Sequence, residues 1–319
     1  MTVGLALAGP TLARLVSARA VCGYLGASAL PAVPRALAGR ALGDDEPPAA
    51  VAIWLLIGGA DVAIDRGRRA LGAAWTPLLV NGVIAIDGAI ARATAAIVGL
   101  GAGLIVGDRL DAPAAAPWPD DSSLHLVGAL PAGQLGAWLD VGTGAAIAPL
   151  AAGPRAHRVR GCDLAPGAIA RATTGAALSG RADLELAVAD LLDGAGPGWD
   201  LITFNAPVPA EHGTEAAGAS GWRRAPAGTA VLERFWATIG ACAAPGAEII
   251  VHSAVADDPW QAHAGRRGTA TIARYTPPGQ PGFAITRWQP DGPDQRRLID
   301  VGLSRATPFV TRAVLTSSP

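Results

Sequence analysis

A glycine-rich turn after an apolar segment is the sequence feature with the clearest chemistry. Residues 138–147 read Trp-Leu-Asp-Val-Gly-Thr-Gly-Ala-Ala-Ile, so an apolar run ends in Asp140 and continues into Gly142, Thr143 and Gly144. Glycines allow a sharp turn and close approach of a ligand, and the N-terminus of a following helix presents free N–H groups. The pattern predicts a strand, a ligand-binding turn and a helix. Dinucleotide-binding enzymes share such a turn, so it does not identify the ligand by itself.

A second apolar segment, residues 158–162, ends in Asp163 and Leu164. Asp163 follows Asp140 by 163 − 140 = 23 positions. A carboxylate at the end of a second strand can bind both ribose hydroxyls of an adenosine group. This spacing fits NAD and other adenosine cofactors equally well.

Two later segments also end in polar side chains. Asp190 and Leu191 follow the apolar segment 184–188, where a carboxylate can accept from an adenine amino group and a leucine can pack on the ring. Asn205 follows residues 199–204 and precedes Ala-Pro-Val. Because the carboxyl ends of parallel strands meet at one edge, we expect all these residues at the same edge of a doubly wound sheet.

The segments LDVGTGAA, CDL, ADLL and FNAPVP, in this order and spacing, resemble the motifs of class I S-adenosylmethionine-dependent methyltransferases. They are most similar to the branch of release-factor glutamine N-methyltransferases and base N-methyltransferases, many of which carry a small additional domain. Residues 117–127, Pro-Trp-Pro-Asp-Asp-Ser-Ser-Leu-His-Leu-Val, also resemble the stretch before the first motif of the glutamine enzymes. The resemblance covers roughly residues 117–254.

The resemblance implies S-adenosylmethionine as the cofactor and S-adenosylhomocysteine as its product. The turn would lie beneath the methionine moiety, with Asp140 orienting its amino group. Residues at the next two strand ends would hold the ribose and the adenine. The implied cofactor-binding residues are Asp140, Gly142, Thr143, Gly144, Asp163, Leu164, Asp190, Leu191 and Asn205.

The fourth motif of that branch is usually Asn-Pro-Pro-aromatic, and its amide oxygen and a following backbone carbonyl accept hydrogen bonds from a target nitrogen. The resemblance therefore assigns acceptor positioning to Asn205 and Pro207, a gain from orientation. This chain has Ala206 in place of the first proline and Val208 in place of the stacking aromatic residue. The third glycine of the first motif is replaced by Ala146. We therefore expect methyl transfer more firmly than nitrogen as its target.

Further substrate contacts are expected from Val208 itself, from His212, and from Trp222 and Arg223, which combine charge and aromatic surface for an anionic or planar substrate. A solvated helix start is the alternative for the last pair. His252 follows residues 249–251 of an expected fifth strand, and either a general base or a structural residue fits there.

Composition limits the possible functions. All 25 basic residues are arginine, which excludes lysine Schiff-base chemistry, and the net charge of −1 argues weakly against a nucleic-acid partner. Three widely spaced cysteines indicate neither disulfides nor a zinc site, and we expect no metal. No signal peptide or membrane span is expected, so the protein should be soluble and cytoplasmic.

Hydrophobic periodicity and breaks at proline and glycine residues divide the chain into three parts. Residues 1–112 are expected to form a helical, winged-helix-like lid or substrate domain, residues 113–134 a linker and helix, and residues 135–319 the cofactor-binding domain. Helices are expected over 11–25, 33–42, 49–57 and 62–71, the last capped by Asp61, with strands over 78–86, 95–98 and 104–106.

The third part alternates strands and helices, which predicts a Rossmann-like α/β domain with a seven-stranded, mostly parallel sheet. The resemblance implies that its last strand is reversed, with antiparallel strands over 269–275 and 283–289. An additional pair of strands is expected over 298–303 and 309–315.

These features favour a methyltransferase that N-methylates a small molecule or peptide in specialised metabolism. An rRNA or protein-glutamine methyltransferase is the second hypothesis. A non-catalytic subunit with a methyltransferase fold remains open because of Ala206 and Val208. An NAD-dependent oxidoreductase is disfavoured by the Asn-Ala-Pro motif and by the lack of a Tyr/Lys pair. The oligomeric state cannot be derived from the sequence.

Overall fold

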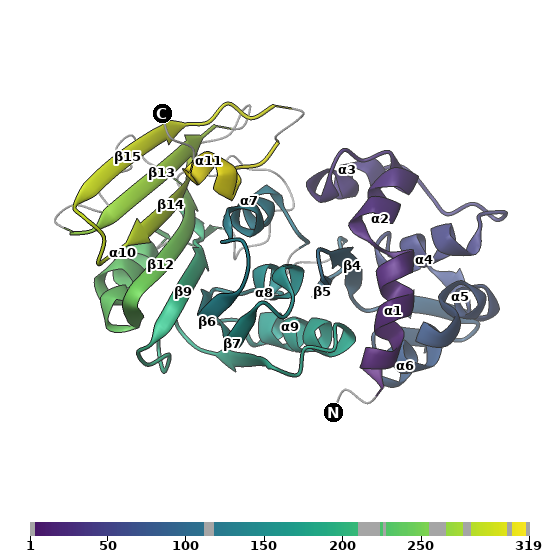
Figure 1. The fold of residues 1–319 in the computed structure, drawn as a ribbon. Coiled ribbons are helices and arrows are strands. Elements are labelled where there is room, and N and C mark those ends of the chain that lie inside the picture. Colours follow the sequence, from purple (N-terminus) through teal and green to yellow (C-terminus); the bar gives the residue numbers. More distant parts are fainter. Residues whose placement is uncertain are drawn as a thin grey trace. The chain divides into compact units, whose positions relative to one another are not determined.

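The computed structural model describes residues 4–111, 118–209, 224–225, 228–254, 266–276, 282–304 and 308–316. Its contacts divide the chain into two compact units. The N-terminal unit comprises residues 1–120, 144–153 and 165–184, and the sheet unit comprises 121–143, 154–164 and 185–319. Figure 1 labels elements of both units where there is room.

An eight-stranded sheet forms the sheet unit, in the order β15-β13-β14-β12-β9-β6-β7-β8 (Figure 1). Strands β7, β6, β9 and β12 are mutually parallel, whereas β14 runs antiparallel to both β12 and β13. The strands are β6 (Leu135–Val141), β7 (Ala156–Asp163), β8 (Leu184–Val188), β9 (Trp199–Asn205), β12 (Ala243–Ala254), β13 (Thr269–Tyr275), β14 (Phe283–Gln289) and β15 (Gln295–Asp300).

This order confirms the Rossmann-like, mostly parallel sheet with a reversed strand, and β15 adds an eighth strand parallel to β13. The expected strand over 309–315 is wrong, because residues Arg312–Thr316 form the helix α11. In that helix Leu315 is buried while its neighbours are exposed or half-buried, which suits one turn lying on a surface.

Burial explains the central strands. β6 and β9 are almost continuously buried, as expected for parallel strands covered on both faces. The apolar core on one face includes Phe204, Phe235, Ile249 and Val251, all with at most 2% of their surface exposed. Phe235 comes from the helix α10 (Gly228–Thr238), which continues into a 3-10 turn at Ile239–Ala241.

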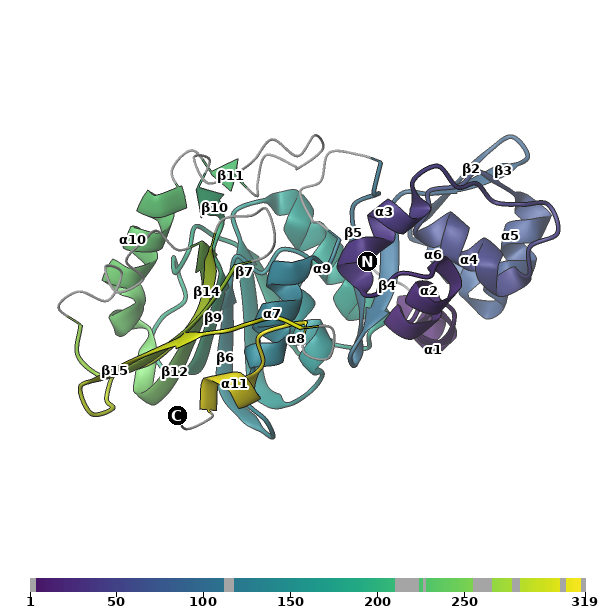
Figure 2. The ribbon, with the colours of Figure 1, turned by 90° about the horizontal axis from the view of Figure 1, so that it is seen from above.

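The helix α7 (Asp121–Ala129) covers the other face, where it contacts β9, β12 and β14. Side chains of alternate strand residues point to opposite faces. On β12, Ile249 and Val251 pack with the core that contains Phe235 of α10, whereas the ring of His252 stacks with that of His125 of α7. The two helices therefore lie on opposite sides of the sheet (Figure 2).

The N-terminal unit is helical with small antiparallel sheets. β3 pairs with both β1 and β2, and β4 pairs with β5. Its elements are α1 (Leu5–Leu15), α2 (Ala18–Leu25), a 3-10 turn (Leu30–Ala32), α3 (Val33–Leu37), α4 (Pro48–Leu56), β1 (Val62–Ala63), α5 (Ile64–Leu71), a 3-10 turn (Gly72–Ala74), α6 (Trp75–Val80), β2 (Ile84–Asp87), β3 (Ile90–Ala93), β4 (Ala96–Leu100) and β5 (Gly103–Gly107). The helices α8 (Ile147–Ala152) and α9 (Pro166–Leu178) also belong to this unit, where both contact β5.

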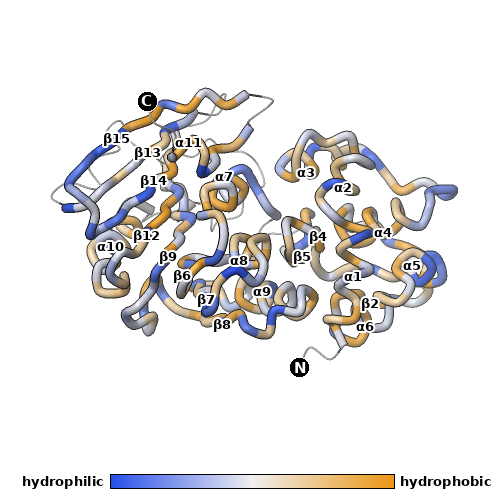
Figure 3. The backbone as a smooth tube through the Cα atoms, viewed as in Figure 1, coloured by the Kyte–Doolittle hydropathy of each residue, from blue (hydrophilic) through white to orange (hydrophobic). Residues whose placement is uncertain are grey.

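The helix α4 is buried at every residue from Ala50 to Leu56, as expected for a helix that is apolar on all sides. The neighbouring α5 is polar and carries three arginines, and Figure 3 shows this difference in hydropathy. The order α4-β1-α5-α6-β2-β3, with β2 and β3 as a hairpin, fits the winged-helix-like unit. That description stays a prediction. Among the described helices, none is both long and apolar enough for a membrane span.

Three local predictions are wrong. The expected strand over 78–86 begins as the helix α6, in which Trp75 and Leu78 are buried at helical spacing, and β2 starts only at Ile84. The expected helix over 11–25 is interrupted, because the Ser17 hydroxyl accepts from the Ala20 N–H and caps a separate α2. Asp61 does not cap α5 but binds Arg92 through both carboxylate oxygens.

Candidate functional site

The sheet order brings the predicted strand-end residues to one edge. β8, β7, β6, β9 and β12 are consecutive neighbours, so their carboxyl ends lie side by side. Asp163 is the last residue of β7 and Asn205 the last of β9, and Asp190 follows β8 by two residues. In open α/β sheets, ligands bind at this edge.

Asp140 lies near the end of β6, and its side chain turns inward. The residue is 3% exposed, and its carboxylate accepts hydrogen bonds from the hydroxyls of Thr143, at 2.6 Å, and Thr203. The indole N–H of Trp138 in turn donates to the Thr203 hydroxyl at 2.8 Å. Burial raises the pKa of Asp140 to about 6, and the two hydroxyl donors oppose this rise. Asp140 therefore holds the turn from within.

The turn after β6 uses left-handed backbone conformations repeatedly. Gly142, Gly144 and Ala146 have φ angles of 60°, 54° and 55°. A Cβ on Gly142 would also lie 3.2 Å from the ring of Phe204, so glycine is required there for two reasons. The Thr143 N–H donates to the Cys162 carbonyl at 2.8 Å, which attaches the turn to β7.

A glycine of β7 that the sequence analysis did not single out supports this turn. A Cβ on Gly161 would lie 2.8 Å from the Thr143 hydroxyl oxygen. Strand glycines often mark such close approaches, but a single glycine among forty others carries little signal in the sequence.

The residues at the end of β7 are more exposed. Asp163 is half-buried, and its backbone carbonyl accepts from the Ala189 N–H at 3.0 Å, which joins the ends of β7 and β8. Leu164 is 69% exposed. An exposed leucine beside a strand-end carboxylate is available to a ligand, and the roles of both residues stay predictions.

The loop after β8 is strained and anchored. Leu191 has a φ of 50°, and its carbonyl accepts a hydrogen bond from the thiol of Cys162 at 3.1 Å. Its side chain packs on the core of the sheet unit. Asp190 pairs with Arg234 of α10 at 2.9 Å, a partner that the sequence did not reveal. Ala146 and Leu191 are the two described non-glycine residues with positive φ, and such strain concentrates at functional sites.

Asn205 lies at the centre of a polar cluster. Its amide oxygen is 2.9 Å from His252 Nδ1, and its amide nitrogen donates to the Ser122 hydroxyl at 2.9 Å. His252 Nε2 is 2.7 Å from the Tyr275 hydroxyl. The backbone N–H of Ala206 donates to the His252 carbonyl at 2.9 Å. The structure thus joins Asn205 to His252 and adds Ser122 and Tyr275, which the sequence did not indicate.

The remaining predicted substrate residues are described in part or not at all. Pro207 is half-buried, and Val208 lies in the short strand β10 (Val208–Pro209), which pairs in parallel with β11 (Arg224–Ala225). His212, Trp222 and Arg223 lie outside the described residues, so their predicted contacts stay predictions. Within the described ranges, no cluster of metal-binding side chains occurs.

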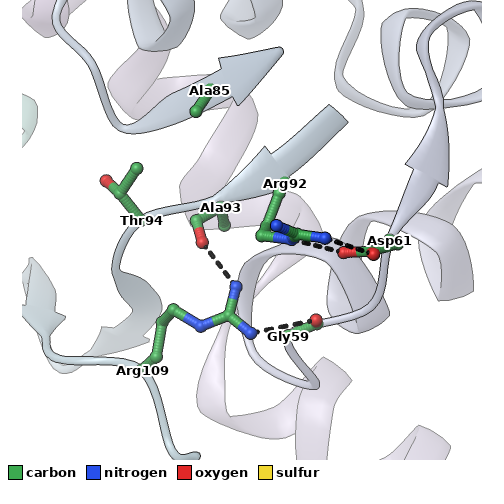
Figure 4. Close-up of a pocket in the computed structure, with 7 residues that line it drawn as sticks. All are labelled: Gly59, Asp61, Ala85, Arg92, Ala93, Thr94 and Arg109. Carbon is green, nitrogen blue, oxygen red and sulfur yellow. Dashed lines mark hydrogen bonds and ion pairs between the residues drawn. The ribbon is translucent and has the colours of Figure 1, made fainter. Parts of the chain in front are cut away.

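An open hollow of about 610 Å³ lies in the N-terminal unit, away from these residues in the sequence (Figure 4). Arg92 lines it and pairs with Asp61. Arg109 also lines it, donating to the Ala93 carbonyl at 2.9 Å and pairing with Asp111. The charges around the hollow therefore neutralise one another locally.

Comparisons with known proteins find similarity in the fold alone. No protein-family model matches the sequence, and no curated protein matches it significantly. Among solved structures, the ribosomal protein L11 methylase of Lactobacillus delbrueckii subsp. bulgaricus is 20% identical, over 53% of this chain and 77% of that one, with a TM-score of 0.40. A SAM-dependent methyltransferase of Agrobacterium tumefaciens is 15% identical, over 72% and 80%, with a TM-score of 0.40.

An rRNA methylase of Streptococcus thermophilus is likewise 15% identical, over 53% of this chain and 94% of that one, with a TM-score of 0.35. These values describe distant likeness, and the substrates named for these proteins say nothing about the substrate of this chain.

Proposed function

We propose that the protein is a class I S-adenosylmethionine-dependent methyltransferase. The observation that carries this proposal is the sheet order with its reversed strand β14, combined with the turn of residues 140–146, Asp163, Asp190 and Asn205 at the corresponding strand ends. The motifs that resemble this enzyme class therefore occur on a sheet of the expected topology.

The residues at this edge of the sheet suit an adenosine cofactor with a methionine tail. Asp163 offers a half-exposed carboxylate to ribose hydroxyls, and Leu191 a partly buried apolar side chain to adenine. At Gly144 the turn leaves open space, since no other atom lies within 4 Å of the position that a Cβ would take. Asp140 fixes that turn from its buried position.

S-adenosylmethionine would supply an electrophilic methyl group on its sulfonium. The part played by the chain is orientation. Asn205, with the backbone of Ala206 and Pro207, would align the acceptor atom with that methyl group, and alignment of reacting groups is a large share of catalysis in such transfers. The exposure of Asn205 is intermediate, so an acceptor can reach its amide.

We propose a small molecule or peptide as the acceptor and the N-terminal unit as a winged-helix-like lid or substrate domain. In winged helices that bind DNA, a basic helix enters the major groove. Here the helix before the hairpin, α6, reads Trp-Thr-Pro-Leu-Leu-Val and carries no charge. The net charge of −1 also gives no net electrostatic attraction to phosphates.

The cofactor proposal is tested by calorimetric titration of the purified protein with S-adenosylmethionine, S-adenosylhomocysteine and NAD. Micromolar binding of the first two, weakened at least tenfold in Asp163→Ala, is expected. Asp44→Ala, which changes an exposed turn of the N-terminal unit, is the matched control and should leave binding unchanged. Binding of NAD alone would favour the oxidoreductase hypothesis instead.

The acceptor proposal is tested by transfer of a labelled methyl group from S-adenosylmethionine to separated protein, RNA and small-molecule fractions of a cell extract. Label in the small-molecule or peptide fraction is expected. Label in RNA, with a steep loss at higher salt, would support an rRNA methyltransferase, and label in a protein glutamine the protein-directed hypothesis. Tight cofactor binding without label in any fraction would support a non-catalytic subunit, which Ala206 and Val208 keep open.

A further inference from the structure

A chain of polar side chains leads from Asn205 into the interior of the sheet unit. Ser122, Asn205, His252 and Tyr275 come from α7, β9, β12 and β13, and are joined at 2.9, 2.9 and 2.7 Å. In the register of β12 and β9, His252 is the direct neighbour of Asn205, so both side chains project from the same face. The cluster therefore depends on the pairing of the parallel strands.

The direction of each hydrogen bond follows from the chemistry of the groups. The Asn205 amide oxygen can only accept, so the proton between it and His252 must be carried by Nδ1 of the imidazole. In the neutral imidazole, Nε2 is then the acceptor, and the Tyr275 hydroxyl donates to it. At the other end, the Asn205 amide nitrogen can only donate, and the Ser122 hydroxyl oxygen accepts.

The interior part of this chain cannot reorient easily. His252 is 1% exposed and Tyr275 3%. The ring of His252 stacks on that of Phe283, with centroids 5.5 Å apart and 19° between planes, and on that of His125 at 6.2 Å. With both ring nitrogens bonded and the ring enclosed, His252 does not reach an acceptor as a general base, the role that the sequence left open.

Resting on the proposed function, we propose that His252 and Tyr275 are positioning residues that hold the Asn205 amide in one orientation. This orientation selects, as the group to be methylated, an uncharged group that can both donate and accept a hydrogen bond. An amide oxygen has two lone pairs and an amide nitrogen two hydrogens. Among the described residues, one of each is taken by His252 and Ser122. The half-exposed Asn205 thus offers one lone pair and one N–H.

A carboxamide or a hydroxyl group can pair with both of these positions. An amine cannot. As an ammonium group it has donors only, and as a neutral amine its single lone pair must face the methyl group, so neither form accepts from the remaining N–H of Asn205. The missing stacking residue at Val208 fits the same acceptor, since a group that is held by two hydrogen bonds needs less help from an aromatic ring.

The orientation itself is tested without any methyl transfer. Long-range ¹⁵N–¹H NMR spectra of the full-length protein labelled at its five histidines report which ring nitrogen carries the proton. The signal of His252, assigned by its loss in His252→Asn, is expected to show an Nδ1–H tautomer. Tyr275→Phe should change this signal, because it removes the donor to Nε2. A pure Nε2–H tautomer would mean the opposite orientation of the Asn205 amide and would overturn the proposal.

The positioning role is tested by kinetics with the acceptor found in the labelling experiment. His252→Phe keeps an aromatic ring and removes both hydrogen bonds, and should lower kcat about 10- to 100-fold while the Kd of S-adenosylmethionine stays within about twofold. His252→Asn should regain most of the rate, because its amide N–H lies near the position of Nδ1. Equal losses in both variants, or none in His252→Phe, would contradict positioning.

The matched control is His157→Asn, which changes an exposed histidine of β7 and should leave kcat unchanged. The methylated product gives the last test. A methylated carboxamide or hydroxyl supports the selection, and a methylated amine overturns it. If no fraction accepts a methyl group, the proposed function fails, whereas the tautomer measurement still decides the orientation of Asn205.

Discussion

The Thr203 hydroxyl of β9 donates a hydrogen bond to the buried carboxylate of Asp140 on the neighbouring strand β6. The direction is imposed by Trp138, whose indole N–H donates to the same hydroxyl oxygen and leaves the hydroxyl proton for Asp140. Thr143 supplies a second donor from the turn. A carboxylate held in this way joins the strand, the turn and the adjacent strand into one rigid edge.

This buried carboxylate predicts a specific pH dependence of stability. Burial raises the pKa of Asp140 to about 6, above its value in the unfolded chain. The folded state therefore binds the proton more tightly, and its contribution to stability is fully present below about pH 4 and lost as the pH rises through 6. The contribution lost amounts to about 3 kcal/mol. Urea unfolding of the protein and of Asp140→Asn between pH 4 and 7 measures it.

The free energy of unfolding of the unmodified protein, relative to that of Asp140→Asn, should fall over this range. The comparison with the variant removes the contributions of all other titrating groups. Parallel pH profiles of the two proteins would show that Asp140 titrates alike in the folded and unfolded chain.

The left-handed conformation of Ala146 predicts different results for two adjacent alanines. Ala145 and Ala146 are both fully buried, but of the two only Ala146 has a positive φ. At each site, replacement by glycine removes a buried methyl group and increases the entropy of the unfolded chain. Together these two effects lower the free energy of unfolding by about 1.5 kcal/mol. At Ala146 the release of backbone strain, about 1 to 2 kcal/mol, offsets this.

Ala146→Gly should thus be nearly neutral, and Ala145→Gly clearly destabilising, in chemical denaturation. Equal losses of stability in the two variants would show that the φ of Ala146 carries no strain.

The positions of Asp140, Asp163, Asp190 and Asn205 could be predicted because each follows an apolar run of strand length, and parallel strand ends share an edge. Which way each of these side chains points depends on burial in the folded protein, which the local sequence does not show. The sequence places Asp140 in a ligand-binding turn, yet its carboxylate faces inward because two threonine hydroxyls meet it there.

Contacts across the sheet could not be predicted. Tyr275 meets His252 because β14 pairs with β12 and β13 at once, with Phe283 opposite both Ala254 and Tyr275. This register is a property of the assembled sheet, and no local pattern around residue 275 expresses it. The sequence predicts a strand in place of the helix α6 for a related reason, since a short apolar run fits both periodicities.

The environment of Cys162 predicts an unreactive thiol. Burial raises its pKa to about 12, and the thiol donates to the Leu191 carbonyl. Because the thiolate is the nucleophile, Cys162 should alkylate about a thousandfold more slowly than an ordinary thiol at pH 8. The half-buried Cys22 should react first. Mass mapping after iodoacetamide treatment measures the order, and all cysteines should react in urea. Early modification of Cys162 in the folded protein would contradict its burial.

A charge cluster between β12, β14 and α11 predicts a stabilising role for Glu248. Its carboxylate accepts from Arg287 at 3.0 Å and from Arg312 at 2.8 Å, and the side chain is 12% exposed. Glu248→Gln leaves two arginines without their counter-charge and should lower the free energy of unfolding by about 2 to 4 kcal/mol. Asp300→Asn breaks an exposed pair with Arg274 of β13, so it is the matched control.

Urea unfolding of both variants at pH 7 measures the difference. The midpoint should fall in Glu248→Gln and stay unchanged in Asp300→Asn, because solvent screens the exposed pair. Neither substitution changes a residue that is proposed to bind the cofactor, so cofactor binding should persist in both variants wherever they remain folded. Equal, small shifts would mean that water replaces the lost carboxylate as a partner of Arg287 and Arg312, and that the C-terminal helix α11 is held by its apolar contacts alone.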